Sequence, residues 1–243
     1  MAATAAIPIF NPQARIHTER LGNGLSCLVV DDALLDPERL LQFAVTQRQA
    51  FQPVDFNAYP GIYLPAPREI LVALEDFFVR NVRRLFDARR SLHMHCRLSM
   101  VTTPPQTLRP NQWICHRDSD GLNAQQSVQA SVLYLFKDET LGGTSFYEQI
   151  RSVEETAQLF RDAEKFSAAD FAQKYSIEPG YIQQSNRYFK QIGRITPKWN
   201  RMIFYDGNIL HSGDILAPEK LSADPRIGRL TLNGFFTSRR NAV

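Results

Sequence analysis

Short apolar runs and alternating apolar and polar residues predict β-strands in six stretches of the chain. Strand-like runs span residues 25–30, 92–101, 131–136, 141–147, 202–205 and 229–236. Residues two apart on a strand share a face, so Arg229 and Thr231 lie on a polar face that alternating leucines back. Gly142 and Gly143 are a turn signal, and we expect a hairpin between the runs on either side of them.

Apolar residues at helical spacing predict helices in the first ninety residues. Asp36 and Pro37 open a helix that runs to about Ala50, because Asp is a preferred N-cap and Pro suits the first helical position. Residues 68–89 carry an apolar stripe, which predicts an amphipathic helix on the outside of a barrel. We therefore expect residues 1–91 to be a helical support for the strands that follow.

Three residues have the chemistry and spacing of a mononuclear metal site. His116 and Asp118 are two apart, so on a strand both side chains point to one face and can reach one ion. His211 follows the apolar run 202–205 and can supply a third ligand from another strand. Two imidazoles and one carboxylate are the facial triad of non-haem Fe(II) sites, which leaves about three of six coordination positions open.

The order of these residues resembles that of the Fe(II)/2-oxoglutarate-dependent dioxygenases, in particular the prolyl-4-hydroxylase-like branch. That pattern has the H-x-D pair, a strand such as 131–136, the Gly-Gly-x-Thr-like stretch at 142–144, then a late His and a basic residue. The resemblance covers about residues 92–237. It implies a mainly β fold with flanking helices, in which a double-stranded β-helix forms a jelly-roll, cupin-like barrel. It also implies Fe(II), the cosubstrate 2-oxoglutarate and O2.

The same resemblance implies an oxidation. Enzymes of this superfamily hydroxylate an unactivated C–H bond and release succinate and CO2; the substrate here would be a small molecule, an amino acid or a peptide. His116, Asp118 and His211 would be the catalytic metal ligands. Because Asp118 keeps the carboxylate that related halogenases lack, hydroxylation is the expected course.

A basic residue after the late His pairs with the far carboxylate of 2-oxoglutarate in that family, and Arg229 fits this role. A guanidinium can hold a carboxylate by two parallel hydrogen bonds, and Thr231 on the same face could donate another. Tyr134 is a further partner by resemblance. Arg226 is a rival, because the loop after His211 is long. We favour Arg229, which begins a strand, whereas Arg226 lies in a turn.

Residues 148–198 interrupt the predicted barrel strands as an insertion. Two helical patterns follow a capping box that begins at Ser152. Segments of this length are often substrate lids. Four aromatic residues in or next to the segment could fold over a substrate, namely Tyr181, Tyr188, Phe189 and Trp199. A surface decoration or the contact of a homodimer is the alternative.

Length, charge and cysteine content fit one enzyme domain over residues 1–243. A chain of this length with 44% hydrophobic content can form a single barrel domain. The net charge of +3 is too small to imply nucleic acid, and no run of about 18 apolar residues implies a membrane span. We therefore expect no nucleic-acid or membrane partner. Cys27, Cys96 and Cys115 form no C-x-x-C pattern, so we expect a reducing, cytoplasmic setting.

Other classes of function stay open. His93 and His95 could belong to a cupin-like metal site, although no Glu follows at the spacing that a cupin needs. The barrel could also be a non-catalytic binding protein, which the complete ligand set disfavours. A nucleobase demethylase is disfavoured because that group needs a second Arg six residues after the first, where this chain has Phe235.

Overall fold

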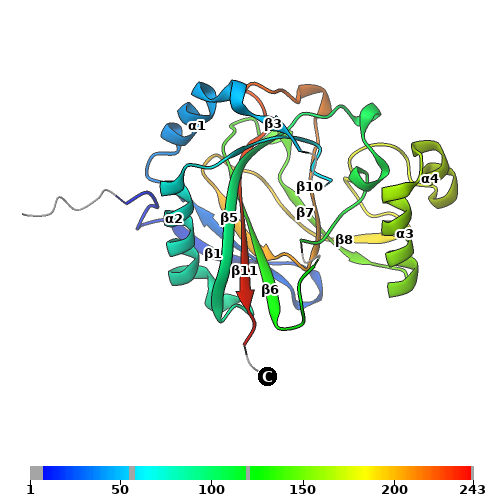
Figure 1. The fold of residues 1–243 in the computed structure, drawn as a ribbon, viewed down its shortest axis with the longest axis horizontal. Coiled ribbons are helices and arrows are strands. Elements are labelled where there is room, and N and C mark those ends of the chain that lie inside the picture. The colour runs from blue at the N-terminus through cyan, green and yellow to red at the C-terminus, as the bar shows by residue number, and fades with distance from the viewer. Residues whose placement is uncertain (1–7, 55–57, 119–120, 242–243) are drawn as a thin grey trace, which may run out of the picture.

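The computed structural model describes residues 8–54, 58–118 and 121–241. Strands form its centre, and helices lie on two opposite sides of them (Figure 1). The strands are β1 (Arg15–Arg20), β2 (Ser26–Asp31), β3 (Gln52–Pro53), β4 (Gly61–Pro65), β5 (Arg90–Val101), β6 (Gln126–Tyr134), β7 (Thr144–Gln149), β8 (Phe189–Ile195), β9 (Met202–Asp206), β10 (Leu210–Gly213) and β11 (Leu230–Arg239). The α-helices are α1 (Pro37–Thr46), α2 (Arg68–Phe77), α3 (Val153–Lys165) and α4 (Ala168–Tyr175).

Two antiparallel sheets form the barrel. The large sheet has the order β1-β2-β9-β6-β11-β5-β4-β3, and the small sheet has the order β10-β7-β8. A bridge between His116 and His211 adds the segment before β6 to the small sheet, beside β10. The four strands β9-β6-β11-β5 and the four segments of the small sheet together have the arrangement of a jelly roll. The predicted double-stranded β-helix fold is confirmed.

The pairing of β5, β11 and β6 sets side chains in rows across the inner face of the large sheet. The inner pairs of β5 and β11 are Ser99 with Thr231, Arg97 with Asn233, His95 with Phe235 and His93 with Thr237. On β6, Tyr134 is opposite Thr231, and Ala130 is opposite Phe235. The intervening residues of β11 point to the outer face. The polar face expected from alternation is therefore the inside of the barrel.

Helices α1 and α2 cover the apolar outer face of the large sheet. Phe78, directly after α2, stacks on Phe236 of β11 with ring centroids 4.0 Å apart, and both side chains are fully buried. The helix predicted over 68–89 is α-helical only to Phe77 and continues as a π-helical turn over Phe78–Val82. This wider turn packs on the outer core, where the ring of Phe78 contacts those of Phe204 and Phe236.

Helices α3 and α4 pack on the outer face of the small sheet, on the other side of the barrel from α2 (Figure 1). Leu159 of α3 and Phe171 of α4 join a buried cluster with Tyr147 of β7 and Leu210 of β10. Because Leu210 and His211 are neighbours on β10, these helices contact the face opposite to His211. Within the described ranges, none of the helices is long and apolar enough to cross a membrane.

The predicted insertion, residues 148–198, lies only partly outside the barrel. β8 falls within it and pairs with β7, so the added helices occupy only the connection between these two strands. Phe189 is buried beneath α3 and α4, and Trp199 packs at the edge of the core under α1 and α2. These two aromatics are therefore not positioned over the barrel mouth. The sequence of β8 mixes polar and apolar residues without regular alternation, so the pattern did not predict a strand there.

The hairpin expected at Gly142 and Gly143 is wrong. β6 and β7 belong to different sheets, and the glycines lie where the chain crosses between them. A Cβ on Gly142 would lie 1.5 Å from the carbonyl oxygen of Asp214, and one on Gly143 would lie 1.9 Å from that of Ile195. Glycine is needed here because two backbone segments approach closely. In the sequence, a Gly-Gly pair required for such an approach cannot be distinguished from one that forms a turn.

Candidate metal centre

The three predicted ligands come together where the H-x-D segment meets β10. His116 and His211 form a bridge in which each backbone N–H donates to the other's carbonyl oxygen, at 3.0 and 2.9 Å. The backbone N–H of Asp118 donates to the carbonyl oxygen of Gly207, in the turn between β9 and β10, at 2.8 Å. The backbone therefore holds the three side chains side by side independently of any bound ion.

The distances between the ligand atoms suit one ion. One ligand atom from each of His116, Asp118 and His211 lies within 4.8 Å of the others, and no other such group occurs within the described ranges. Asp118 Oδ2 is 3.3 Å from His211 Nε2, and Asp118 Oδ1 is 3.7 Å from His116 Nε2. Neighbouring ligands with bonds of about 2.1 Å lie roughly 3 Å apart, so small side-chain movements complete the triad.

The hydrogen bond at the back of His211 determines what its front can bind. Nδ1 lies 2.8 Å from the carbonyl oxygen of Ile209, so the neutral ring carries its proton on Nδ1 and donates it there. Nε2 then presents a lone pair to Asp118 Oδ2, which is buried and accepts no hydrogen bond. Burial lowers the pKa of His211, but the carboxylate of Asp118 outweighs it and raises that pKa, so either a proton on Nε2 or a bound metal ion satisfies this pair of atoms. The donor set therefore fits a metal ion.

The protonation states of His116 and Asp118 also fit a metal. Partial burial and the neighbouring His211 lower the pKa of His116, which keeps its ring neutral at neutral pH. Burial raises the pKa of Asp118, but the two histidines outweigh it, so the carboxyl group titrates below its usual range. Neutral imidazole and ionised carboxylate are the forms that bind metals. The side chain of His116 is 52% exposed, against 6% for His211, so the site opens on the His116 side.

Arg229 lies deeper in the barrel, directly before β11, and is 4% exposed. Its Nε donates to the carbonyl oxygen of Gly142 at 2.9 Å, and its Nη2 donates to that of Gly143 at 2.6 Å. Its Cζ is 5.6 Å from the ring centroid of Phe136. These contacts fix the plane of the guanidinium. Gly142 and Gly143, expected to form a turn, instead position this arginine through their carbonyl groups.

The rival arginine points away from the barrel. The side chain of Arg226 is 55% exposed, and its Nη1 lies 3.3 Å from Asp224 Oδ2. Its backbone N–H donates to the same carboxylate, at Oδ1, at 3.0 Å. Arg226 thus closes a turn on the surface, while Arg229 alone of the two reaches the interior.

Tyr134 and Thr231 lie in the inner row next to Arg229. Tyr134 Oη is 2.9 Å from Thr144 Oγ1, and Thr231 Oγ1 donates to the carbonyl oxygen of Ser99 at 3.4 Å. Both side chains are fully buried. Burial raises the pKa of Tyr134, so the phenol stays neutral and can donate a hydrogen bond. The structure thus brings the three residues predicted for the cosubstrate to one end of the barrel.

Three further side chains reach the interior, and of these the sequence indicated only Tyr181, as an aromatic residue of a possible lid. Tyr59, from the loop before β4, and Tyr181, from the loop before β8, each interact electrostatically with Arg229. Tyr181 Oη also donates to the carbonyl oxygen of Thr103 at 2.6 Å, so one predicted lid aromatic does face the barrel. Arg97 of β5 interacts with Tyr59 and Asp118. The alternation of residues 92–101 is the signal that could have found Arg97, whereas the loop tyrosines have no periodic signal.

The histidines and cysteines outside the triad form no second metal group within the described ranges. The rings of His93 and His95 are 5.8 Å apart, and His95 stacks on Phe235. Cys96 is a free, buried residue, and burial raises the pKa of its thiol to about 12, so it stays protonated. Cys27 and Cys115 are also free and buried. The cupin-like alternative gains no support from these positions.

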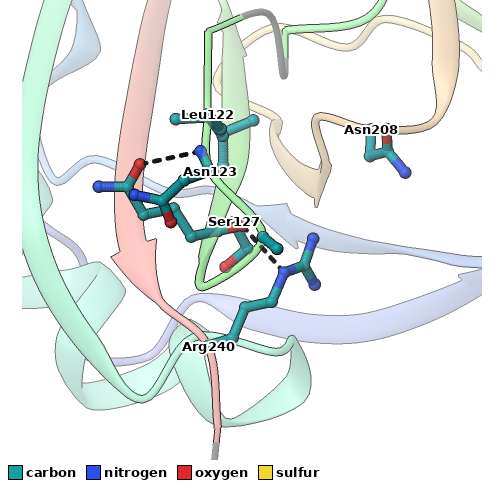
Figure 2. Close-up of a pocket in the computed structure, with 8 residues that line it drawn as sticks. Leu122, Asn123, Ser127, Asn208 and Arg240 are labelled. Carbon is teal, nitrogen blue, oxygen red and sulfur yellow. Dashed lines mark hydrogen bonds between the residues drawn. The ribbon is translucent and has the colours of Figure 1, made fainter.

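A recess of about 210 Å³ at the start of β6 does not include the triad (Figure 2). The residues labelled at this recess are Leu122, Asn123, Ser127, Asn208 and Arg240. Arg240 Nε donates to the carbonyl oxygen of Gln126 at 2.9 Å, and its Nη1 donates to Asp87 Oδ2 at 2.8 Å. Because the charged group of this recess is paired, we place the candidate chemistry at the triad.

Several solved structures are similar to this chain. The carbocyclase SnoK from nogalamycin biosynthesis, a non-haem α-ketoglutarate-dependent enzyme, has 15% identity and a TM-score of 0.51, over 89% of this chain and 83% of that one. A Pseudomonas putida prolyl-4-hydroxylase has 13% identity and a TM-score of 0.41, over 86% and 89%. HygX from Streptomyces hygroscopicus, with nickel and 2-oxoglutarate bound, has 10% identity and a TM-score of 0.44, over 88% and 82%. The likeness to the carbocyclase shows the shared jelly-roll fold.

Comparison of the sequence with curated proteins finds no match. A protein-family profile, in contrast, matches residues 12–236. This match includes strands of both sheets, the three candidate metal ligands and Arg229. The chain therefore belongs to the family described as a family of unknown function, DUF6445.

Proposed function

We propose that this protein is an Fe(II)- and 2-oxoglutarate-dependent oxygenase that hydroxylates an unactivated C–H bond of a small molecule, amino acid or peptide. The observation that carries the proposal is that ligand atoms of His116, Asp118 and His211 lie within 4.8 Å of one another. A facial set of two imidazoles and one carboxylate suits Fe(II) and keeps positions open for a bidentate cosubstrate and O2.

His116, Asp118 and His211 would hold the iron, and Arg229 would bind the far carboxylate of 2-oxoglutarate. Two N–H groups of Arg229 are held by backbone carbonyls, which orients the others for an anion. Thr231 and Tyr134 would donate further hydrogen bonds to the same carboxylate. When bound, iron and 2-oxoglutarate supply the oxidation, in which substrate, 2-oxoglutarate and O2 give hydroxylated substrate, succinate and CO2.

Side chains around the triad would position it and exclude water. Tyr205 packs edge-on against the ring of His211, with centroids 4.7 Å apart, and Phe146 packs against Tyr205 at 5.1 Å. Burial raises the pKa of Tyr205, so its phenol is neutral beside the ligands. Tyr59 and Tyr181 would close the end of the barrel at Arg229. The lid role proposed for residues 148–198 therefore narrows to the loop that carries Tyr181.

Anaerobic titration with Fe(II) and then 2-oxoglutarate tests this proposal. We expect a weak visible metal-to-ligand charge-transfer band that saturates with one equivalent of iron. Zn(II) in place of Fe(II) should give no band, because it is redox-inactive. Absence of the band with Fe(II) would leave the barrel as a non-catalytic or cupin-like metal-binding protein.

Formation of succinate in the presence of a substrate identifies the reaction. We expect a panel of amino acids, peptides and small organic acids to contain compounds that raise the rate of succinate formation above the rate without substrate. The single enzyme domain over residues 1–243, the cytoplasmic location and the homodimer stay predictions.

A further inference from the structure

A second arginine lies inside the barrel, on the strand beside β11. Arg97 of β5 is opposite Asn233 of β11, and Ser99 on the same face is opposite Thr231. Residues two apart on a strand are separated by roughly 7 Å. Arg97 therefore lies one row nearer the exposed end of β5 than the row of Thr231 and Tyr134, which the proposed function assigns to the cosubstrate.

An aromatic ring positions the Arg97 guanidinium. Its Cζ is 5.0 Å from the ring centroid of Phe235, and His95 stacks on the same residue at 4.9 Å, with 18° between the ring planes. A guanidinium stacked on a ring keeps its N–H groups in its own plane, where a planar carboxylate can accept two of them. Phe235 is itself half-buried, so it also offers an apolar surface beside that plane.

The charge of Asp118, a member of the triad, acts on Arg97. Arg97 interacts electrostatically with Asp118 and with the phenols of Tyr59 and Tyr63. In the proposed function the negative charge of Asp118 is offset by iron, so Arg97 makes the barrel mouth electropositive. Burial, together with Arg97, lowers the pKa of His95, so His95 is neutral at neutral pH and adds no second charge. The single positive charge of Arg97 matches a substrate group with one negative charge better than a phosphate dianion.

We propose that Arg97 binds the carboxylate of the substrate, and that the substrate is an organic acid whose apolar part packs on Phe235. This inference rests on the proposed function for its location next to the iron ligands. It adds a second anion site to the barrel, separate from that of Arg229. The two sites would hold cosubstrate and substrate at different depths in the barrel.

Binding of 3-phenylpropionate and its uncharged amide, 3-phenylpropionamide, to the full-length protein tests the inference by calorimetry, both without metal and with one equivalent of Zn(II) to offset the charge of Asp118. The two probes share one apolar part and differ in the carboxylate. We expect the acid to bind about 10- to 100-fold more tightly, the range for a charge-assisted hydrogen-bonded pair. Arg97→Gln should abolish this preference, and Arg97→Lys should keep part of it, because Lys retains the charge without the planar fork.

Matched variants separate the two parts of the site. Arg90→Gln removes an exposed arginine at the start of the same strand and should leave the preference unchanged. Phe235→Leu should weaken acid and amide by the same factor, because it alters the apolar surface alone. Circular dichroism of each variant checks that it is folded. If Arg97→Gln does not fold, the preference for the acid is measured in Arg97→Lys instead.

Several results would overturn the inference. The wild-type protein could bind acid and amide with equal affinity, or it could bind neither. Folded Arg97→Gln could also keep the full preference for the acid. Displacement of 3-phenylpropionate by 2-oxoglutarate in the metal-free protein would assign Arg97 to the cosubstrate instead. Loss of the iron charge-transfer band alone, with the acid preference intact, would contradict the proposed function and leave the carboxylate site standing.

Discussion

The two faces of β5 and β11 differ although they share one backbone. On the outer face Leu98, Leu232 and Phe236 are fully buried against α1 and α2. On the inner face Arg97 and Thr231 line the barrel, and hydrogen bonds and charges replace apolar contacts. The strand ladder is common to both faces, so the difference comes from side chains alone.

The comparison shows how the barrel can keep polar groups inside. The outer core supplies burial of apolar area, which is the main favourable term in folding. The inner face then tolerates groups such as Asp118 Oδ2 that are buried without a hydrogen bond. Substitutions on the outer face should therefore change stability, and substitutions on the inner face should change ligand binding.

Loss of a triad histidine should have the largest effect on the inner face. His116→Ala and His211→Ala should each abolish iron retention and succinate formation while the protein stays folded, because the backbone bridge between these residues does not need the rings. Iron content after gel filtration measures the first effect. His17→Ala, at an exposed position on β1, is the control and should retain both. Intact turnover in both triad variants would show that the metal is held elsewhere.

A cavity in the outer core should lower stability and leave cosubstrate binding unchanged. Phe236→Ala should lower the free energy of unfolding by about 3–5 kcal/mol, the cost of removing a buried aromatic ring. The affinity of the folded protein for 2-oxoglutarate should not change. Urea unfolding and the charge-transfer titration measure the two quantities. If Phe236→Ala weakened cosubstrate binding without loss of stability, the division between the faces would be wrong.

Removal of Arg229 should weaken cosubstrate binding by about 2–5 kcal/mol, the cost of breaking a desolvated, hydrogen-bonded charge pair. Arg226→Ala is the matched control and should have little effect, because Arg226 is exposed and pairs with Asp224. The midpoint of the anaerobic 2-oxoglutarate titration distinguishes them. A larger effect for Arg226 would mean that the cosubstrate enters from the surface loop.

The smallest effect should come from the helices behind the small sheet. Lys174 Nζ and Tyr175 Oη donate to Asp162 Oδ2 at 2.5 and 2.6 Å, and these bonds lower the pKa of Asp162 to about 2. A lowered pKa in the folded state stabilises the fold above the ordinary carboxyl pKa. This contribution is lost as the pH falls from about 4 to about 2.

Hydrogen exchange as a function of pH measures this effect. After each rate is divided by the intrinsic exchange rate at that pH, amides of α3 and α4 should be less protected at pH 3 than at pH 6. Asp162→Asn should lower their protection at pH 6 and leave little further loss at pH 3. Protection of β11 should change little, since β11 lies in the other sheet. Equal loss of protection in both regions would show that α3 and α4 are coupled to the barrel core.

Much of this architecture could be predicted from local patterns. Alternation separated Arg229 and Thr231 from the leucines of β11, and the capped helix at Asp36 forms as expected, with its carboxylate accepting the N–H of Arg39 at 3.1 Å. The two-residue spacing of His116 and Asp118 placed both side chains on one side of the chain. These predictions held because each depends on residues close together in sequence.

Other features depended on contacts between distant segments. The pairing of β8 with β7, the crossing at Gly142 and the inward direction of Arg229 rather than Arg226 follow from how the two sheets close on each other. The position of Arg97 beside the triad likewise requires β5 and the H-x-D segment to meet inside one barrel. The sequence by itself determined the composition of each face and the residues able to bind a metal. Only the tertiary structure decided which face is inside, because strand periodicity specifies two faces but not which one the other sheet covers.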